Sequence, residues 1–433
     1  MTKILIVTSG FRGILNCSLA IAKKLEDLGY EIVCASPGDV GKEVAEAGFS
    51  FYQQPSIYRP EKEKNKAWLV RKIWNRKSPM QLLGQDSFAD LIQTLNIGLV
   101  IVDIELREYV FTAYQQNIPI ILLSQWFNHL ADDTFPLLCS YQYPSGDQEE
   151  RKILSTELEI RKGRLEHKYI QLQKKTSGLD RFSMLEKYRS YCQFPIDQIE
   201  LYTWPPPFTF KNMPTLFCNN EELEFPHIRP ENHTYIGPQI WERSHGGISQ
   251  RLTDFIDFCS RSKRNLVYAT VGTLSKEYSS FFNRLLRAVY ERNDLMLIIS
   301  HGNSKVHSNY INDSVLLCDY VPQYEVLIKA DLCINHAGIN TINECLYLEV
   351  PMLIYTAGEH DQPGCTKRLQ YHQLAHVGDL VEDDYRRIST RISNVLKDSK
   401  LKQKMATARQ HLEAIDWESR LENIINDQLN LNK

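Results

Sequence analysis

Short apolar runs that alternate with amphipathic stretches constrain this chain more than any other feature. Residues 3–8 form an apolar run, Gly10 and Gly13 follow it, and after a helix-like stretch residues 31–35 form a second run. Apolar runs without polar alternation are typical of parallel strands that are buried on both faces. A strand, a loop, a helix and a strand within about 30 residues make one unit of a doubly wound sheet. We therefore expect an α/β protein.

The alternation is interrupted once, which indicates two domains rather than one large sheet. Residues 157–189 are highly charged and helix-like in composition, and a proline-rich stretch follows at residues 204–207. The total of 433 residues also suits two or three domains of roughly 150 residues each. We place the division near residues 235–262. The strand candidates after the first unit are residues 98–103, 118–123, 265–271, 295–300, 315–317, 332–334 and 351–355.

Composition and charge argue against several classes of protein. The 50 Lys and Arg against 53 Asp and Glu give a formal net charge of −3, unlike a protein that coats nucleic acid. No apolar run approaches the roughly 18 residues needed to cross a bilayer, and residues 1–10 lack the features of a signal peptide. Ten cysteines are scattered without a CxxC pair, so neither a zinc site nor a disulfide framework is indicated. These features predict a cytoplasmic protein with reduced thiols and no nucleic-acid partner.

The densest functional signal is a strand that leads through a glycine-containing loop into a helix. Residues 332–334 are the strand, Gly338 lies in the loop, and His336 and Asn340-Thr341 supply side-chain donors. The amino end of a helix attracts anions through its free amides and its dipole, so a phosphate fits this loop. Glu344, one turn into the helix, suits the two hydroxyls of a ribose. On the generic signature alone, a structural turn with a capping or core histidine is the more frequent interpretation.

The order of the motifs around this loop resembles a known family. The motifs are Tyr320-Val321-Pro322-Gln323, residues 336–341, Glu344, Val350-Pro351 and Asp361-Gln362-Pro363, with Tyr235-Ile236-Gly237-Pro238 and residues 267–273 upstream. Together they look like the nucleotide-sugar signature of UDP-dependent glycosyltransferases of the glucosyl/glucuronosyltransferase family, in their bacterial form. The resemblance is strong over residues 214–380 and loose before them. Several spaced motifs in order are more specific than any one of them.

This resemblance implies the GT-B fold, in which two Rossmann-like doubly wound domains face each other across a cleft. Residues 1–235 would be the acceptor-binding domain and residues 236–410 the nucleotide-sugar domain. Residues 411–433 would form a helix that crosses back to the first domain. The resemblance further implies a UDP-sugar as co-substrate, with no metal and no resident cofactor.

The resemblance also assigns donor-site roles, position by position. Tyr320, followed by Val321, would lie beneath the uracil ring, where a flat aromatic face suits stacking. An acidic and an amide side chain suit the hydroxyls of a sugar. The matching positions are Gln323 near the base and ribose, Gly272 and Thr273 facing the phosphates and sugar, His336, Gly338, Asn340 and Thr341 at the diphosphate, Glu344 at the ribose, and Asp361 and Gln362 at the sugar hydroxyls.

The main departure from the family lies at the expected catalytic base. Relatives have a Gly-His pair after the first strand, and an ungapped alignment of residues 13–25 puts Ile14 in place of that histidine. The family's partner aspartate matches Asp103. Three explanations stay open: Asp103 with nearby Glu105 acts directly as the base, His129 substitutes, or the acceptor needs no strong base. A further alternative is a chain that has lost activity and only binds a nucleotide sugar.

Two further segments bear on the acceptor. Residues 59–77 carry eight Lys and Arg against two Glu, with Trp68 and Trp74 among them. Such a segment suits peripheral contact with the inner face of an anionic membrane, although a solvated surface helix is the commoner case. The aromatic stretches Trp126-Phe127 and residues 202–208 suit either an apolar acceptor pocket or inter-domain core.

The resemblance thus predicts an inverting, metal-independent hexosyltransferase. It would move a sugar, with glucose from UDP-glucose as the leading choice, to a small hydrophobic or lipid-like acceptor. An epimerase or hydrolase of nucleotide sugars with the same fold is the alternative enzyme, and a lapsed nucleotide-sugar-binding protein is the alternative outside enzymology. Transfer needs a second substrate, which the alternatives do not.

Overall fold

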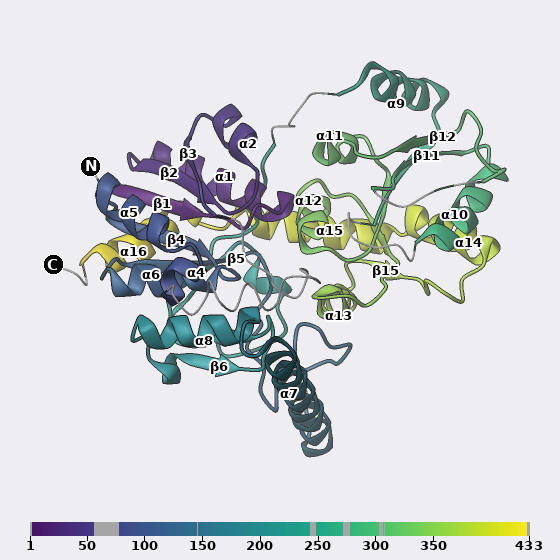
Figure 1. Cartoon of the computed structure of the whole chain (residues 1–433). Helices are drawn as coiled ribbons and strands as arrows, with labels where there is room; N and C mark the ends of the chain where they lie inside the picture. Colours follow the sequence, from purple (N-terminus) through teal and green to yellow (C-terminus); the bar gives the residue numbers. More distant parts are fainter. Residues whose placement is uncertain are drawn as a thin grey trace.

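The computed structural model describes residues 2–55, 78–144, 146–242, 248–271, 278–302, 306 and 308–430. Two parallel sheets, each with its own hydrophobic core, form two α/β domains (Figure 1). The expected α/β class with two doubly wound sheets is therefore confirmed. The basic segment at residues 59–77 lies outside the described residues.

The N-terminal sheet has seven parallel strands in the order β3-β2-β1-β4-β5-β8-β9. Ile6 of β1 pairs with Cys34 of β2 on one side and with Ile101 of β4 on the other, which places β1 in the middle. Ile4 and Ile6 pack into a core on one face, whereas Leu5 and Val7 pack into a core on the other. This two-sided burial explains why the strands read as unbroken apolar runs. The strands are β1 Lys3–Val7, β2 Glu31–Ser36, β3 Ser50–Gln53, β4 Leu99–Asp103, β5 Ile120–Ser124, β8 Thr215–Phe217 and β9 His233–Tyr235.

Helices cover both faces of this sheet, and a short antiparallel hairpin lies beside it. The hairpin, β6 Ile199–Leu201 with β7 Phe208–Phe210, was not expected from the sequence. The helices include α1 Arg12–Asp27, α2 Gly41–Glu46, α4 Pro79–Leu82, α5 Asp86–Leu95, α6 Arg107–Gln115 and α8 Arg181–Tyr191.

One helix of this domain, α7 Gln148–Thr176, stands apart from the rest. It has 29 residues, of which only Leu154 is buried, and it projects below the N-terminal domain in Figure 1. The Asp147 carboxylate caps its amino end by accepting from the Glu150 amide at 2.9 Å. Ser177, in the left-handed conformation, ends it. The charged composition of residues 157–189 predicted helices here, and the structure contains α7 and α8.

The C-terminal sheet has six parallel strands in the order β12-β11-β10-β13-β14-β15, around one large core. The strands are β10 Asn265–Thr270, β11 Leu295–Ser300, β12 Val315–Cys318, β13 Leu332–Asn335, β14 Met352–Ile354 and β15 His376–Val377. The helices are α9 Gln250–Ser262, α10 Ser279–Tyr290, α11 Gln323–Leu327, α12 Ile339–Tyr347, α13 Gln362–His372, α14 Tyr385–Lys397 and α15 Ser399–Glu413.

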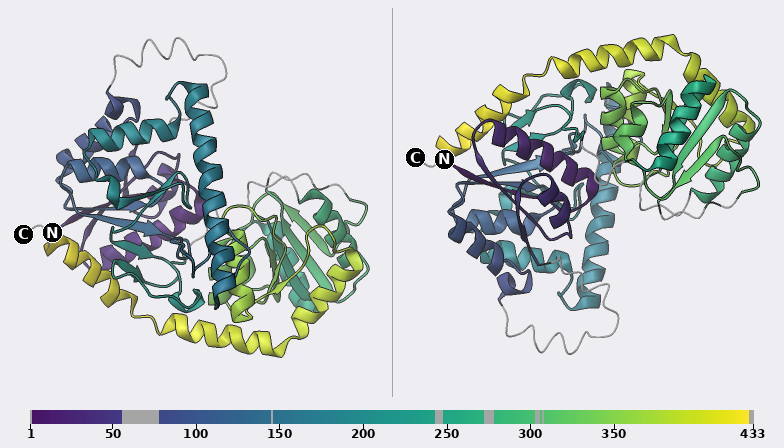
Figure 2. Two further views of the ribbon diagram at one scale, coloured as in Figure 1. Left: turned by 90° about the horizontal axis from the view of Figure 1, so that it is seen from below. Right: turned by 90° about the horizontal axis from the view of Figure 1, so that it is seen from above.

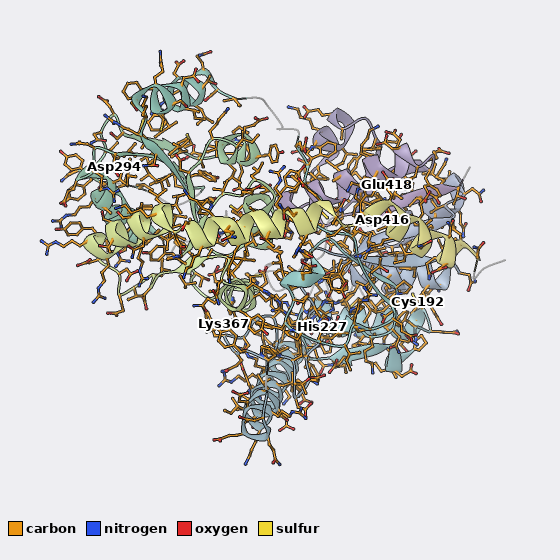
Figure 3. The ribbon with its side chains drawn as sticks, turned by 180° about the vertical axis from the view of Figure 1, so that it is seen from behind. Cys192, His227, Asp294, Lys367, Asp416 and Glu418 are labelled. Carbon is orange, nitrogen blue, oxygen red and sulfur yellow. The ribbon has the colours of Figure 1, made fainter. Side chains whose placement is uncertain are left out.

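The last helix, α16 Trp417–Asn430, returns to the N-terminal domain. Leu421 and Ile425 are fully buried in the core that contains Ile4 of β1, and Arg420 donates to the Tyr235 carbonyl at 2.7 Å. Figure 2 and Figure 3 show α15 and α16 running across from one domain to the other, past Asp416 and Glu418. The chain thereby joins its two domains a second time. Among the described residues, no helix is both long and apolar enough to cross a membrane.

Candidate functional site

A cleft of about 200 Å³ lies where the carboxyl ends of strands from both sheets meet. Its N-terminal wall is the start of α1 with Cys218 after β8, and its C-terminal wall follows β10, β11, β12 and β13. Several residues assigned from the sequence to the nucleotide lie on that second wall. The lining includes Gly13, Asn16, Cys17 and Cys218 on one side and Tyr268, Thr270, Ser300, Tyr320, Val321, Gln323, Asn340, Asn343 and Glu344 on the other.

The loop between β13 and α12 presents the amino end of α12 to this cleft. The Asn335 side chain accepts from the Ala337 amide at 2.9 Å, and Ala337 has a positive φ of 67°. Gly338 is the N-cap of α12, and no described side chain caps this helix end. A Cβ on Gly338 would lie 2.9 Å from Nε2 of His336, so a larger residue would push the imidazole aside. The free amides of the first turn, beside His336, are groups that could bind an anion.

His336 is neutral in this environment. Burial lowers its pKa to about 4, and a hydrogen bond with the Thr270 backbone opposes part of that shift. A neutral imidazole still carries one N–H, so His336 can donate a hydrogen bond to a phosphate oxygen at pH 7 without bringing a full charge.

Glu344 is held by a short network on the same wall. Nε2 of Gln323 lies 2.5 Å from a Glu344 carboxylate oxygen and 3.2 Å from the Thr341 hydroxyl, to both of which it donates. The Tyr268 hydroxyl donates to the other end of the Gln323 amide at 3.2 Å. Burial raises the pKa of Glu344 to about 7, and the Gln323 hydrogen bond opposes that rise. The network fixes a carboxylate where a diol would bind.

The remaining donor-site predictions have different outcomes. Tyr320 lines the cleft and is half exposed, whereas Val321 is buried. Asp361 and Gln362 begin α13 on a neighbouring wall and do not line the cleft. Burial raises the pKa of Asp361, and Gln362 accepts from the Thr356 hydroxyl at 2.7 Å. Gly272 and Thr273 lie outside the described residues.

Two hydrogen bonds cross the cleft, and sequence reasoning missed their N-terminal partners. Asn340 donates to the Gln125 side chain at 3.1 Å, and Asn343 donates to the Asn219 side chain at 2.9 Å. Gln125 directly follows β5 and Asn219 follows β8. Polar residues at the ends of adjacent buried strands are the signal that would have identified them, because parallel strands end at one edge. A Cβ on Gly13 would lie 2.2 Å from the Asn340 amide nitrogen, so a side chain at this position would displace the Asn340 amide.

Asp103 ends β4 on the N-terminal side, with its carboxylate buried. One oxygen accepts from the Glu105 amide at 3.0 Å, and the other accepts no hydrogen bond from the described residues. Burial, and then the negative charge of Glu105, raises the pKa of Asp103 to about 7, against smaller opposing contributions from Ser9. The carboxylate faces a hollow of about 10 Å³ that Ile14, Cys17 and Trp126 also line. Ile14 thus lies beside Asp103, where the family resemblance would put a histidine.

The structure places His129 away from this hollow, which corrects its candidacy as a substitute base. Its ring lies 3% exposed in the N-terminal domain, with Nε2 2.8 Å from the Thr209 hydroxyl of β7. Burial, with the nearby His233 and Arg107, lowers the pKa of His129 to about 3. An imidazole that cannot take up a proton at neutral pH, and that does not border the cleft, is not placed to act as a base.

A second pocket of about 420 Å³ lies between the domains, beside the start of α13. The rings of Trp126 and Trp204 are 5.8 Å apart, which links this pocket to the hollow at Asp103. Residues 202–206 therefore contribute to a pocket, whereas Phe127 is buried in the inter-domain core. The lining consists of Leu137, Cys139, Tyr141, Leu158, Arg161, Arg164, Leu165, Tyr202, Thr203, Trp204, Pro206, Gly358, His360 and Pro363.

The wall that carries Asp361 is fastened to the N-terminal domain. The Gly364 amide donates to the Leu138 carbonyl at 2.9 Å, and Arg368 forms an ion pair with Glu224 at 2.8 Å, with both side chains 1% exposed. The Arg368 guanidinium also lies 5.0 Å from the centre of the Phe127 ring. A buried ion pair of this kind is costly to break from one side, so it fixes α13 in place.

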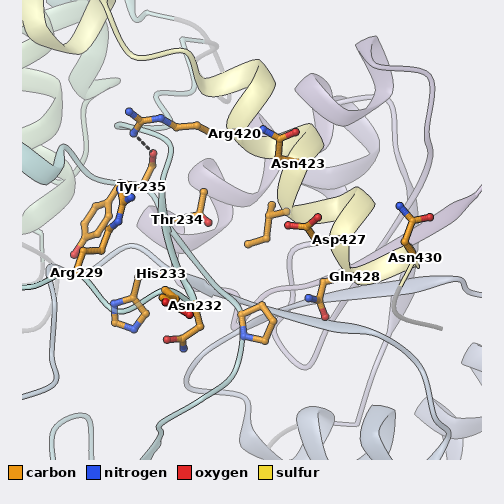
Figure 4. A pocket seen from close by; sticks show the side chains of 13 residues that line it. Arg229, Asn232, His233, Thr234, Tyr235, Arg420, Asn423, Asp427, Gln428 and Asn430 are labelled. Carbon is orange, nitrogen blue, oxygen red and sulfur yellow. Dashed lines mark hydrogen bonds between the residues drawn. The ribbon is translucent and has the colours of Figure 1, made fainter. Parts of the chain in front are cut away.

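A larger hollow, of about 790 Å³, lies elsewhere, and none of the predicted site residues line it. It runs along edge strand β9 and α16, among the side chains of Asn232, Thr234, Asn423 and Asp427 (Figure 4). Arg420 crosses it to the Tyr235 carbonyl, so this groove is the junction of the returning helix. Among the described residues, no group of three or more His, Cys, Asp or Glu side chains is arranged to hold a metal ion.

Comparison with known sequences places the C-terminal half in a described domain family. Residues 266–420 match the glycosyltransferase family 28 C-terminal domain. The uncharacterised UDP-glucosyltransferase YojK of Bacillus subtilis is 32% identical over 130 residues, which is 30% of each chain. The first curated relatives are thus matched over about a third of their length. The NDP-glycosyltransferase YjiC of Bacillus subtilis is 23% identical over 90% of this chain and 91% of its own.

Solved structures share the fold of the whole chain. The glycosyltransferase of kitacinnamycin superposes with a TM-score of 0.65 at 17% identity, over 98% of each chain. The glycosyltransferase VinC, solved in complex with dTDP, superposes with a TM-score of 0.65 at 13% identity, over 99% of each chain. The two-domain arrangement is therefore the GT-B fold.

Proposed function

We propose that this chain is a sugar-transferring enzyme of the bacterial UDP-glycosyltransferase type, because residues 266–420 match the glycosyltransferase family 28 C-terminal domain and the whole chain has the GT-B fold. The proposed donor is a UDP-sugar, with UDP-glucose as the leading choice because the relative YojK is named as a UDP-glucosyltransferase. The observation that carries the proposal is the placement of Glu344 and the amino end of α12 in one cleft, with Asp103 in a neighbouring hollow that Cys17 also lines.

The donor would be held from base to diphosphate along the C-terminal wall. The uracil would stack on Tyr320, and the ribose hydroxyls would donate to Glu344, which Gln323 orients. The diphosphate would meet the free amides at the start of α12, with His336 and Asn340 as side-chain donors. These groups would also stabilise the negative charge that develops on the departing diphosphate, because fixed dipoles cost little reorganisation during the reaction.

Asp103 would accept the proton of the acceptor hydroxyl. Its pKa of about 7 suits a general base at neutral pH, and its unpartnered oxygen has a lone pair available. Attack from the N-terminal side on a sugar whose diphosphate lies on the C-terminal side would invert the anomeric carbon. Because Ile14 occupies the position of the usual histidine, Asp103 would act as the base directly, without a His–Asp dyad.

Hydrolysis of the donor is a second candidate function, which one observation favours. The hollow in front of Asp103 measures about 10 Å³, which is roughly the space of one water molecule. Release of UDP without any added acceptor, at the same rate as with one, would identify a hydrolase.

The proposed compartment is the cytoplasm, because all ten cysteines are free, as in a reducing environment. Contact of residues 59–77 with a membrane surface stays a prediction.

A thermal-shift screen tests the donor site. Wild type, Glu344→Ala and His336→Ala are heated with UDP, UDP-glucose, UDP-galactose, UDP-GlcNAc and dTDP-glucose. A ligand that binds only the folded state at 100 times its Kd stabilises that state by about 2.7 kcal/mol. We expect a uridine nucleotide to raise the Tm of wild type and to lose most of that effect in both variants. No shift with any nucleotide would refute the proposal.

A further inference from the structure

The second inter-domain pocket, between α7 and the 358–363 loop, is lined by positively charged side chains. Their charge indicates what kind of molecule would bind there. The pocket adjoins the proposed reaction centre, because Trp204 lines it and Trp126 borders the hollow at Asp103, and the centres of these two rings lie 5.8 Å apart. It also abuts Pro363, two residues after Asp361. An acceptor bound in this pocket would therefore extend toward both Asp103 and the donor sugar.

Positive charge lines the outer part of the pocket, and its described lining contains no aspartate or glutamate. Arg161 is oriented by a 2.8 Å ion pair with Glu157, whose other oxygen accepts from the Ser140 hydroxyl at 2.8 Å. Glu157 therefore compensates the charge of Arg161.

Arg164 lies one turn further along α7 and is exposed. It forms no hydrogen bond or ion pair with any described residue, so its guanidinium is an uncompensated cation at the mouth of the pocket. A guanidinium presents paired N–H donors that match the two oxygens of a carboxylate.

The body of the pocket is aromatic and aliphatic. Tyr141, Tyr202 and Trp204 provide ring faces, and Leu158 and Leu165 of α7 provide aliphatic surface. A flat apolar molecule buries its faces against such walls. Lining this pocket is therefore a role for α7. The helix has 29 residues with a single buried one, so it contributes little to the core.

We propose that the acceptor is a flat, mainly apolar molecule that carries a carboxylate at the end remote from its reactive hydroxyl. This inference rests on the proposed sugar transfer. Arg164 binds the carboxylate at the mouth of the pocket, and the hydroxyl lies toward Trp204 and Asp103. The opposite charges of Arg164 and Asp103 fix the direction of the acceptor, because a carboxylate beside Asp103 would be repelled.

A matched pair of probes tests this inference: 6-hydroxy-2-naphthoic acid and its methyl ester. Binding is measured by quenching of tryptophan fluorescence, which needs no transfer, and reaction is measured by UDP release from UDP-glucose. The variants are Arg164→Gln and, as a matched control, Lys174→Gln. Lys174 is an exposed cation ten residues further along the same helix, about 15 Å away at 1.5 Å per residue.

We expect wild type and Lys174→Gln to bind the acid three- to tenfold more tightly than the ester, with the ratio falling as salt is raised. Arg164→Gln should bind both probes equally and leave the affinity for the ester unchanged. An ester that binds as tightly as the acid in wild type, a preference that survives in Arg164→Gln, or no binding of either probe would overturn the inference.

The two hypotheses fail in distinguishable ways. An acid preference that depends on Arg164, without acceptor-dependent release of UDP, would refute sugar transfer and leave the anion-binding pocket. Acceptor-dependent release of UDP without an acid preference would refute only the carboxylate inference.

Discussion

Each domain holds a buried carboxylate near the cleft, Glu344 in the cleft itself and Asp103 in the hollow beside it, but in different ways. Burial raises the pKa of both Glu344 and Asp103 to about 7. Gln323 donates to Glu344, whereas one oxygen of Asp103 receives no donor from the described residues. Similar burial thus gives the two carboxylates a similar pKa, but they differ in whether an oxygen is left to accept a hydrogen bond or a proton. Under the proposed function, the C-terminal wall would bind the donor, and Asp103 would accept a proton on its unpartnered oxygen.

The largest expected effect on donor binding comes from Glu344→Gln, which removes the negative charge of this side chain. Hydrogen bonds to a charged group contribute about 1.5–3 kcal/mol, so the Kd for UDP should rise roughly 10- to 100-fold. The amide keeps the shape of the side chain and its contact with Gln323. Isothermal titration of UDP measures the change. A Kd within twofold of wild type would show that Glu344 does not bind the nucleotide.

The next largest effect is expected from Asp103→Asn, on the pH dependence of the stability of the protein. The pKa of Asp103 is raised in the folded state, so the folded protein keeps this proton to higher pH than the unfolded chain does. This group therefore makes the protein less stable as pH rises from about 4 to about 7. Asp103→Asn removes that dependence, and its Tm relative to wild type should rise by a few °C between pH 5 and pH 8. Thermal unfolding at the two pH values measures it.

A Tm difference that stays constant between these pH values would mean that Asp103 has an ordinary pKa. Because Asn cannot titrate, the comparison depends on the change of the Tm difference with pH. A uniform cost of the substitution itself does not affect that change.

The smallest effect is expected from Ile14→His, which would sharpen the comparison by giving Asp103 a partner. Ile14 and Asp103 line the same hollow, so the new imidazole would lie beside the unpartnered oxygen. We expect transfer to accelerate several-fold and its pH profile to shift, because a His–carboxylate pair would replace the lone carboxylate. UDP release measured from pH 5 to pH 9 tests this. Unchanged rates at every pH would argue that Asp103 does not take the proton.

The sequence could indicate which residues of the C-terminal wall lie together because they are close along the chain. His336, Asn340 and Glu344 belong to one strand–loop–helix unit, so local pattern and family resemblance place them together. Asp103 was also identifiable, since it ends a buried strand. The alternation of strands and helices was sufficient to predict two doubly wound sheets.

Long-range packing explains what the sequence did not reveal. His129 was a reasonable candidate after a strand, but its ring packs toward Thr209 of a hairpin that carries little sequence signal. Gln125 meets Asn340 only because the two domains approach each other at Gly13. Likewise, the charge of α7 was visible, but its contact with residues 202–206 was not.

The central claim is that the C-terminal wall binds the donor and that Asp103 accepts the proton. Asp103→Asn, assayed for both donor binding and sugar transfer, tests this claim most directly. The account predicts a Kd for UDP within twofold of wild type and acceptor-dependent release of UDP slowed by about 10²- to 10⁴-fold, the usual contribution of a general base. Transfer at the wild-type rate with intact donor binding would contradict it.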